Sequence, residues 1–99
     1  MFHISIYKTP YGTMLFAADE ELVGKAFYDE DRKIALLVSE KLYGDKLVEE
    51  ADLVKLMYEA SVLVLTGKKT VEIAVKLGLV HPEAVLYVKN VPHAHVYKM

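Results

Sequence analysis

Apolar and polar positions alternate along the start of the chain. Residues Phe2–Tyr7 alternate and include β-branched and aromatic side chains, which predicts a strand with one buried face. Met14–Ala18 predicts a second strand. Thr9–Gly12 between them has turn chemistry, because proline presets φ and glycine tolerates positive φ. The chain is therefore predicted to open with a β-hairpin.

Two later segments have the spacing of amphipathic helices. Between residues 49 and 60, apolar positions recur every three or four residues and fall on one helical face. Between residues 69 and 77 a second set recurs in the same way, and Gly78 marks the predicted end. These apolar positions are Leu53, Leu56, Met57 and Ala60 in the first helix, and Val71, Ala74 and Val75 in the second.

Four short apolar runs predict the remaining strands. They span residues 34–38, 61–65, 85–88 and 95–97. The polar residues 28–33 predict a loop. Asp19 is expected to cap a short helical turn, which Gly24 ends.

The predicted order of elements is β-β-β-α-β-α-β-β. The succession over 61–65, 69–77 and 85–89 predicts a βαβ unit with parallel strands and a right-handed crossover. Hairpins at both ends make the expected sheet mixed. We therefore expect an α/β fold of mixed α+β character, as one globular domain over residues 1–99.

Composition narrows the class of protein. The absence of cysteine excludes disulfide scaffolds and thiol chemistry. No signal-peptide pattern is present and no apolar run approaches the ~20 residues that span a bilayer, so a cytoplasmic location without a membrane partner is expected. Glutamine is also absent and asparagine occurs once, at Asn90, which is typical of thermophilic proteins.

Charge is distributed unevenly around a net value of −2. Residues 19–59 carry twelve acidic and six basic side chains, a balance of −6. Residues 65–99 carry five lysines and two glutamates, a balance of +3. This asymmetry can orient a charged partner, although two differently solvated faces also account for it.

The joint between the fourth predicted strand and the second helix has the chemistry of an anion site. Gly67 lets the backbone approach a ligand, Lys68 and Lys69 add charge, and Thr70 can donate a hydroxyl at a helix amino terminus. The spacing is not that of a Walker A loop, so nucleotide hydrolysis is not indicated. The helix dipole and two exposed ion pairs give roughly 2–3 kcal/mol, whereas millimolar binding needs about 4 kcal/mol. A phosphate subsite of a larger ligand, or merely a solvated turn, is expected.

His93 and His95 are two residues apart, so on a strand both imidazoles point to the same side. Such a pair can supply two metal ligands, with His81 or His3 as a third, but no sequence pattern fixes that third ligand. Histidine pairs are more often ordinary core or surface residues, and no metal or cofactor is expected. No motif identifies a nucleophile or a pair of catalytic carboxylates.

The last two predicted strands suggest a surface for RNA. If they pair as a hairpin, Tyr87 and Lys89 could share a face with His93, His95 and Tyr97. Aromatic side chains stack on unpaired bases while lysine meets phosphate, which is how sheets bind single-stranded RNA. Half-buried packing is the alternative role of such tyrosines.

Four segments give the chain a resemblance to a known family. They are Asp19–Lys25, Leu42–Gly44, Val64–Ala74 and Val91–Ala94. In these segments the chain resembles the archaeal proteins called domain of unknown function 424, over nearly its whole length. Asn90 and His95 stand where the closing motif of that family has glycine and glutamine. The resemblance implies an archaeal origin and draws attention to Asp19, Gly24, Lys25, Gly67, Pro92 and His93, without assigning them a role.

These features lead to three hypotheses. The first is a non-catalytic RNA- or ribonucleoprotein-binding module linked to translation, whose binding weakens with salt. The second is a small enzyme that holds an anionic substrate at Lys68 and Lys69, with His93 as general acid or base. The third is a protein-interaction module that uses a strand edge or the acidic face of helix 49–60. The first two expect the Gly67–Thr70 joint and the His93 loop to share one hollow.

Overall fold

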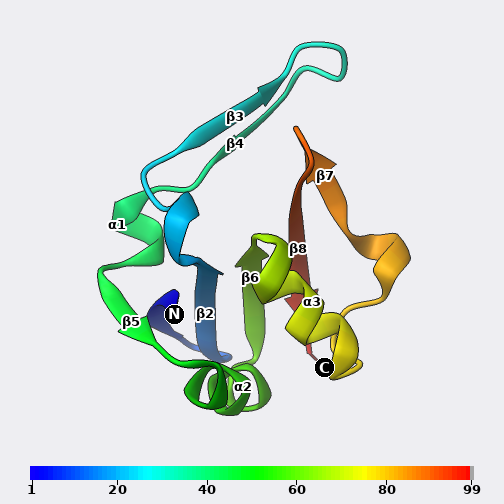
Figure 1. The fold of residues 1–99 in the computed structure, drawn as a ribbon. Helices are drawn as coiled ribbons and strands as arrows, with labels where there is room; N and C mark the ends of the chain where they lie inside the picture. The colour runs from blue at the N-terminus through cyan, green and yellow to red at the C-terminus, as the bar shows by residue number, and fades with distance from the viewer. Residues whose placement is uncertain (99) are drawn as a thin grey trace.

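The computed structural model describes residues 1–98, and its main feature is a six-stranded sheet in the order β5-β1-β2-β6-β8-β7 (Figure 1). Strands from both ends of the chain lie in this one sheet. The radius of gyration is 12.7 Å, close to the roughly 13 Å of a compact domain of about 100 residues. The predicted mixed α/β fold is confirmed.

The sheet is built from β1 (Phe2–Thr9), β2 (Gly12–Asp19), β5 (Lys46–Val48), β6 (Val62–Thr66), β7 (Leu86–Val88) and β8 (Val91–Tyr97). A separate hairpin consists of β3 (Ala26–Asp29) and β4 (Ile34–Leu37). The helices are α1 (Glu40–Tyr43), α2 (Glu50–Glu59) and α3 (Lys68–Lys76). Two short 3-10 turns complete the chain, η1 (Glu20–Leu22) and η2 (Pro82–Ala84).

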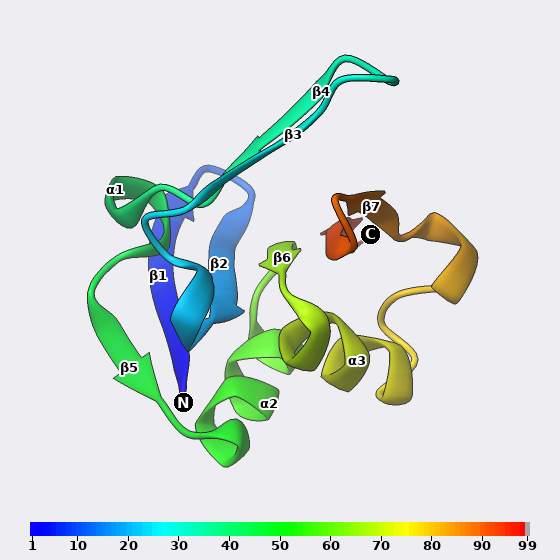
Figure 2. The same ribbon diagram turned by 45° about the horizontal axis from the view of Figure 1, so that its top comes forward.

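Helices α2 and α3 cover one face of the sheet, which we call the helix face (Figure 2). Alternation along the strands turns Leu15 of β2, Leu63 and Leu65 of β6 and Ala94 of β8 toward these helices. Leu53 and Met57 of α2 are completely buried against them. The two predicted helices are thus confirmed within a residue at each end, because their apolar spacing matches the face that they bury.

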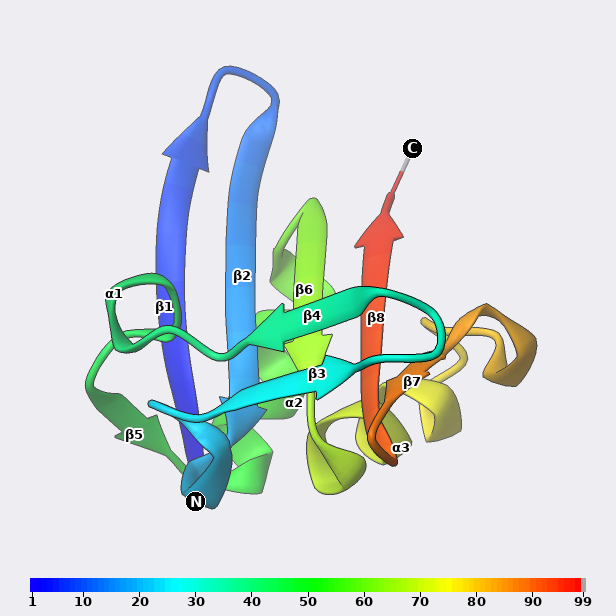
Figure 3. The same ribbon diagram turned by 90° about the horizontal axis from the view of Figure 1, so that it is seen from above.

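The opposite face is covered only in part. Helix α1 and the hairpin β3–β4 lie across it near the ends of β2 and β6 (Figure 3). They enclose a second, smaller apolar cluster that includes Leu36, Val38 and Tyr43. Since α1 and β5 are short and weakly patterned, neither was predicted from the sequence.

The strand neighbours differ from those expected for the βαβ unit. Strands β6 and β7 run in the same direction, but β8 lies between them and pairs antiparallel with both. The hydrogen-bonded parallel pair is β2 with β6. The reason is the two-residue turn Lys89–Asn90, whose positive φ values fold β8 straight back along β7. None of the helices within residues 1–98 is long and apolar enough to cross a membrane.

Candidate functional site

The amino end of α3 holds a carboxylate that belongs to the chain itself. The side chain of Asp19, at the end of β2, accepts hydrogen bonds from the Lys69 N–H at 3.1 Å and from the Thr70 N–H at 2.8 Å. It also accepts one from the Thr70 hydroxyl at 2.8 Å. Asp19 is 3% exposed and Thr70 is completely buried. The internal carboxylate therefore takes the donors that the sequence analysis assigned to an external anion.

The parallel pairing of β2 and β6 explains why Asp19 lies there. Ala18 pairs with Thr66, so the next residue of each strand, Asp19 and Gly67, emerges at the same edge of the sheet. Gly67 has φ +110, and a Cβ added to it would lie 2.4 Å from the Asp19 carboxyl carbon. Glycine is needed here to make room for an internal carboxylate, not for a phosphate. The expectation that Thr70 and the helix amino end are available to a ligand is corrected on this ground.

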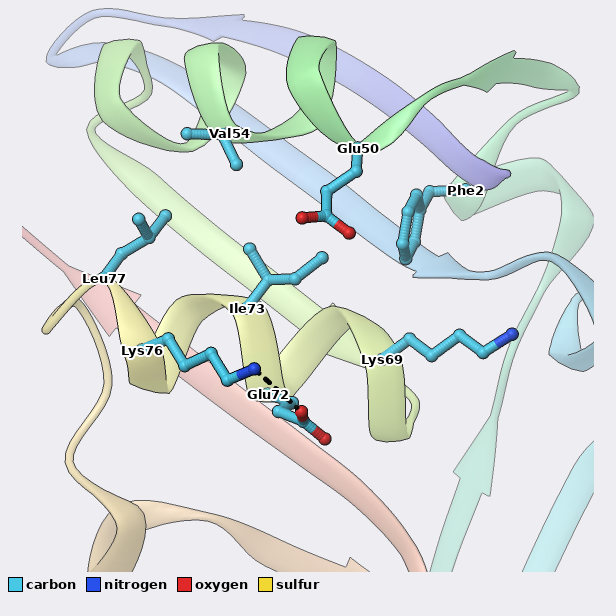
Figure 4. A pocket seen from close by; sticks show the side chains of 8 residues that line it. All are labelled: Phe2, Glu50, Val54, Lys69, Glu72, Ile73, Lys76 and Leu77. Atoms are coloured by element: carbon cyan, nitrogen blue, oxygen red, sulfur yellow. Dashed lines mark ion pairs between the residues drawn. The ribbon is translucent and has the colours of Figure 1, made fainter.

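The two lysines of the joint are exposed, and Lys68 lines a groove together with Asp19. Figure 4 shows Lys69 at the rim of a cleft of about 280 Å³ between α2 and α3. The floor of this cleft is apolar, with Phe2 and Ile73, and its rim also carries Glu72, which forms an ion pair of 3.3 Å with Lys76. Two glutamates, Glu50 and Glu72, balance the two lysines of this cleft, so its net charge does not favour an anion.

The joint and the loop before the last strand meet through their backbones. The Gly67 N–H donates to the Pro92 carbonyl at 2.9 Å, and Thr66 is paired with His93. Their side chains, however, lie on opposite faces of the sheet. Pro92 lines grooves on the helix face together with Lys68, whereas His93 points to the other face. The single hollow that the RNA-binding and enzyme hypotheses both expected, with the lysines and the imidazole together, does not form.

A hydrogen-bonded chain of four side chains runs from the second apolar cluster to the surface. The Tyr43 hydroxyl is 2.8 Å from Thr66 Oγ1, which is 2.8 Å from His93 Nδ1. His93 Nε2 is in turn 2.8 Å from His95 Nε2. Tyr43 is 2% exposed and Thr66 is completely buried, while His95 is exposed. The chain thus connects a buried phenol to solvent through His93.

The direction of this chain follows from the buried phenol. The Tyr43 hydroxyl has no other hydrogen-bond partner within residues 1–98, and a buried unpaired O–H costs about 1–3 kcal/mol. Tyr43 therefore donates to Thr66, Thr66 donates to His93 Nδ1, and His93 carries its proton on Nε2 and donates to His95. In this arrangement His95 accepts at Nε2 and presents its Nδ1–H to solvent.

Burial determines the protonation states of His93 and Tyr43 in this hydrogen-bonded chain. Burial, and to a smaller extent the charge of the neighbouring His95, lower the pKa of His93 from 6.5 to about 4. Burial also raises the pKa of the Tyr43 hydroxyl, which the hydrogen bond with Thr66 opposes. His93 is consequently neutral at pH 7 and Tyr43 keeps its proton, as the chain of donors requires.

Metal binding by His93 and His95 would disturb this arrangement. A metal on His93 Nε2 moves the proton to Nδ1, which then donates to Thr66, so one of the two buried O–H groups, that of Tyr43 or that of Thr66, loses its acceptor in this chain. Of the two candidate third ligands, His3 has its Nδ1 3.0 Å from the Gly44 carbonyl, and His81 Nδ1 accepts the Glu83 N–H. No group of three or more potential ligands is present within residues 1–98.

Gly24 and Lys25 lie where the chain enters the hairpin β3–β4. The Gly24 N–H donates to the Val38 carbonyl at 2.7 Å, and the Lys25 carbonyl accepts from the Val38 N–H at 2.9 Å. Gly24 has φ +91 with open space around it, and both residues are exposed. These contacts give both residues a backbone role at the base of the hairpin.

The hairpin β3–β4 crosses the partly covered sheet face at one end of β2 and β6, and within residues 1–98 no helix or strand crosses it at their other end (Figure 3). Four side chains form a row across neighbouring strands there, and His95 lies in the next row. We call these five residues the open face: Tyr7, Met14, Val62, His95 and Tyr97. Tyr97 is 69% exposed, and its ring centroid lies 6.4 Å from that of His95.

Two residues of the open face were predicted from the sequence to share a surface, and the other three were not. His95 and Tyr97 share a face as expected, but Tyr87 pairs with Pro92 and lines a groove on the helix face. Tyr7 and Met14 come from the other end of the chain, and only the strand register brings them to Tyr97. The hydrogen-bonding roles of Tyr43 and Thr66 were not predicted either. For Thr66 the only signal in the sequence was a polar residue at the end of an apolar strand.

Comparison with known proteins identifies relatives but no activity. A family model described as "Protein of unknown function (DUF424)" matches residues 7–99. A crystal structure of an uncharacterized conserved protein from Methanopyrus kandleri superimposes with a TM-score of 0.72 at 21% sequence identity. The match covers 99% of this chain and 93% of that chain. At this identity the likeness shows the fold alone. No curated protein matches the chain.

Proposed function

The chain belongs to the DUF424 family, whose description names no activity, and from the open face we propose that it is a non-catalytic module that binds single-stranded RNA. The ribosome and other translation complexes are the assemblies in which we place it. One observation carries the proposal: the exposed side chains of Tyr97 and His95 are neighbours on a sheet face that no helix or strand covers within residues 1–98. The apolar side chains of Met14 and Val62 lie beside them on the same face.

Such a face suits unpaired bases. A base is a flat, weakly polar ring, and it stacks on tyrosine and histidine side chains without a requirement for a particular sequence. The Nδ1–H of His95 points to solvent in the donor chain derived above, so it can donate to a base carbonyl or a phosphate oxygen. Because Tyr43, Thr66 and His93 hold His95 through hydrogen bonds, little side-chain entropy is lost on binding.

Charge on this side of the sheet is compatible with RNA. None of β1, β2, β6 and β8 directs a carboxylate to this face, because Asp19 points to the helix side. The carboxylates of α2 lie behind the sheet. Helix α1 borders the open face, since the Tyr7 hydroxyl donates to the Lys41 carbonyl at 3.1 Å, and this helix carries one exposed lysine, Lys41, beside one exposed glutamate, Glu40. One lysine implies about one phosphate contact, and hence a salt slope near −0.7 rather than the steep dependence expected from the sequence.

The expected affinity is modest. Stacking contributes about 1–3 kcal/mol for each base, so two bases on Tyr97 and His95 give about 4 kcal/mol at the middle of this range, which corresponds to a dissociation constant of about 1 mM. The module is thus suited to act within a larger ribonucleoprotein, where a second attachment raises the effective concentration of RNA.

Fluorescence anisotropy with a labelled oligouridylate of about ten nucleotides tests the proposal. Tyr97→Ala is expected to weaken binding about 5- to 30-fold, whereas Tyr97→Phe keeps the stacking ring and most of the affinity. Tyr58→Ala is the matched control, because Tyr58 is 56% exposed on α2, on the other side of the sheet. Equal losses for Tyr97→Ala and Tyr58→Ala, or no binding at about 1 mM chain, contradict the proposal.

A further inference from the structure

The hairpin β3–β4 is apolar on both of its faces. Its inner face, with Phe27, Ile34 and Leu36, packs on the second apolar cluster. Its outer face consists of four exposed residues, and none is polar. They are Ala26 and Tyr28 of β3 and Ala35 and Leu37 of β4.

This outer face departs from what its sequence pattern leads one to expect. A continuous apolar run such as Ile34–Val38 is typical of a strand that is buried on both faces. In the isolated chain only one face is covered, while Tyr28 stays 47% and Leu37 63% exposed. Figures 1 and 3 show the hairpin lying over the sheet, and the four residues of its outer face stay exposed within residues 1–98. The apolar pattern is satisfied only if a partner covers it.

We propose that this partner is a second copy of the chain, which packs its own β3–β4 hairpin on the first, outer face to outer face, about a two-fold axis. Strand register supports a self-complementary fit. Ala26 is opposite Leu37 and Tyr28 is opposite Ala35, so the two large side chains occupy one diagonal and the two alanines the other. A two-fold axis in the plane of the interface then places each large side chain over an alanine of the other copy.

Charges at the ends of the hairpin favour the antiparallel orientation. Outside the Asp29–Arg32 ion pair the turn carries Glu30, Asp31 and Lys33, all exposed and in no ion pair within residues 1–98, so the two carboxylates and one lysine leave a net charge of −1. The base carries the exposed Lys25 directly before Ala26. With the two hairpins antiparallel, the acidic turn of each copy lies against the lysine of the other, whereas a parallel arrangement brings like charges together.

The edges of the main sheet offer less to a partner. Strands β5 and β7, at the two edges, have three residues each, and such short edges discourage strand addition. The outward carbonyl of Tyr87 in β7 also accepts from the Arg32 guanidinium, whose position is fixed by its 2.8 Å ion pair with Asp29. The outer face of the hairpin, rather than a sheet edge, is the surface that lacks cover.

The proposed dimer is weak. Four side chains from each copy are far fewer than the roughly 20–30 residues a side of a standard interface, so rapid, concentration-dependent association is expected. Sedimentation equilibrium from about 10 μM to about 1 mM chain measures it. The average mass should rise from 11.2 kDa toward twice that value as concentration increases.

Two sets of variants test the contact. Leu37→Asp should keep the chain at 11.2 kDa throughout, and Leu47→Asp is the matched control, because Leu47 is an exposed leucine on β5. Glu30→Lys should weaken association at least 3-fold, and adding Lys25→Glu should restore it. A wild-type chain that stays monomeric at about 1 mM overturns the proposal. So does association that Leu37→Asp leaves unchanged, which would assign the dimer to another surface.

Discussion

Asp19 and Thr70 are joined by two hydrogen bonds of 2.8 Å, one from the backbone and one from the hydroxyl of Thr70. The two residues are 51 positions apart and both are buried. Their contact lets a strand residue cap the amino end of a helix from which it is remote in sequence. It therefore connects β2 to α3, and it removes from solvent the backbone donors that resembled a phosphate site.

Removal of the Asp19 carboxylate should destabilise the fold. Asp19→Ala leaves two buried N–H groups and the Thr70 hydroxyl without an acceptor, and we expect a loss of about 2–4 kcal/mol in urea unfolding. Thr70→Val should cost about 1–2 kcal/mol, with a coupling energy above about 0.5 kcal/mol in the double-mutant cycle. Asp31→Ala, an exposed carboxylate in the β3–β4 turn, is the control and should change stability little. A stable Asp19→Ala chain would falsify the capping role.

Gly67 should tolerate substitution far less well than Gly78. Both have positive φ, but a Cβ on Gly67 would meet the Asp19 carboxylate, whereas Gly78 has nothing within 4 Å. We expect Gly78→Ala to cost about 1–2 kcal/mol for its backbone conformation alone. Gly67→Ala should cost at least about 3 kcal/mol, because it also displaces the capping carboxylate. Similar losses at both positions in urea unfolding would mean that Asp19 does not crowd Gly67.

Much of the fold could be predicted from local pattern. The β1–β2 hairpin and the helices α2 and α3 were predictable because their periodicity reflects the face that each buries. The insertion of β8 between β6 and β7 could not be read from the sequence in the same way. It depends on positive φ at Lys89 and Asn90, of which neither is glycine, so the usual signal of a tight turn is missing.

The site was less predictable than the fold. The motif Gly67–Thr70 has the residue types of an anion site, and only the parallel pairing of β2 with β6 reveals that Asp19 fills it. The two histidines were correctly expected to share a face. The contribution of Tyr43 depends on α1, a helix of four residues too short for periodicity to detect.

The stability of the chain should fall as the pH drops below about 6.5. Burial lowers the pKa of His93 to about 4 in the folded chain, below its ordinary value of 6.5, so the unfolded chain binds the proton more readily between these values. The contribution of His93 to the free energy of unfolding is therefore fully present above about pH 6.5 and is lost as the pH falls through about 4. We expect this loss in the free energy of unfolding to be about 1–2 kcal/mol, because solvent screens the partly exposed His93 ring.

Urea unfolding at several pH values measures this effect against a His93→Gln variant. The variant should show a shallower pH dependence between about pH 4 and 6.5, whatever its absolute stability. His81→Gln, at an exposed histidine, should keep the wild-type slope. Identical slopes for wild type and His93→Gln would contradict the role given to His93.

The protonated nitrogen of each histidine is a direct consequence of the donor chain. Long-range ¹H–¹⁵N spectra at pH 7 should show the proton of His93 on Nε2 and that of His95 on Nδ1. Tyr43→Phe removes the donor that sets this direction, so the second arrangement of protons should become populated in that variant. A proton on His93 Nδ1 in the wild-type protein would contradict the donor order from Tyr43 through Thr66 and His93 to His95.

We propose above all that the open face, with exposed His95 and Tyr97 and half-buried Tyr7, Met14 and Val62, meets RNA, and that the start of α3 does not. The most direct test is an NMR titration of the ¹⁵N-labelled chain with an unlabelled oligouridylate of about ten nucleotides. The account predicts shifts that cluster at Met14, Val62, His95 and Tyr97 and saturate together. Shifts that cluster instead at Lys68–Thr70, or none at about 1 mM RNA, would contradict it.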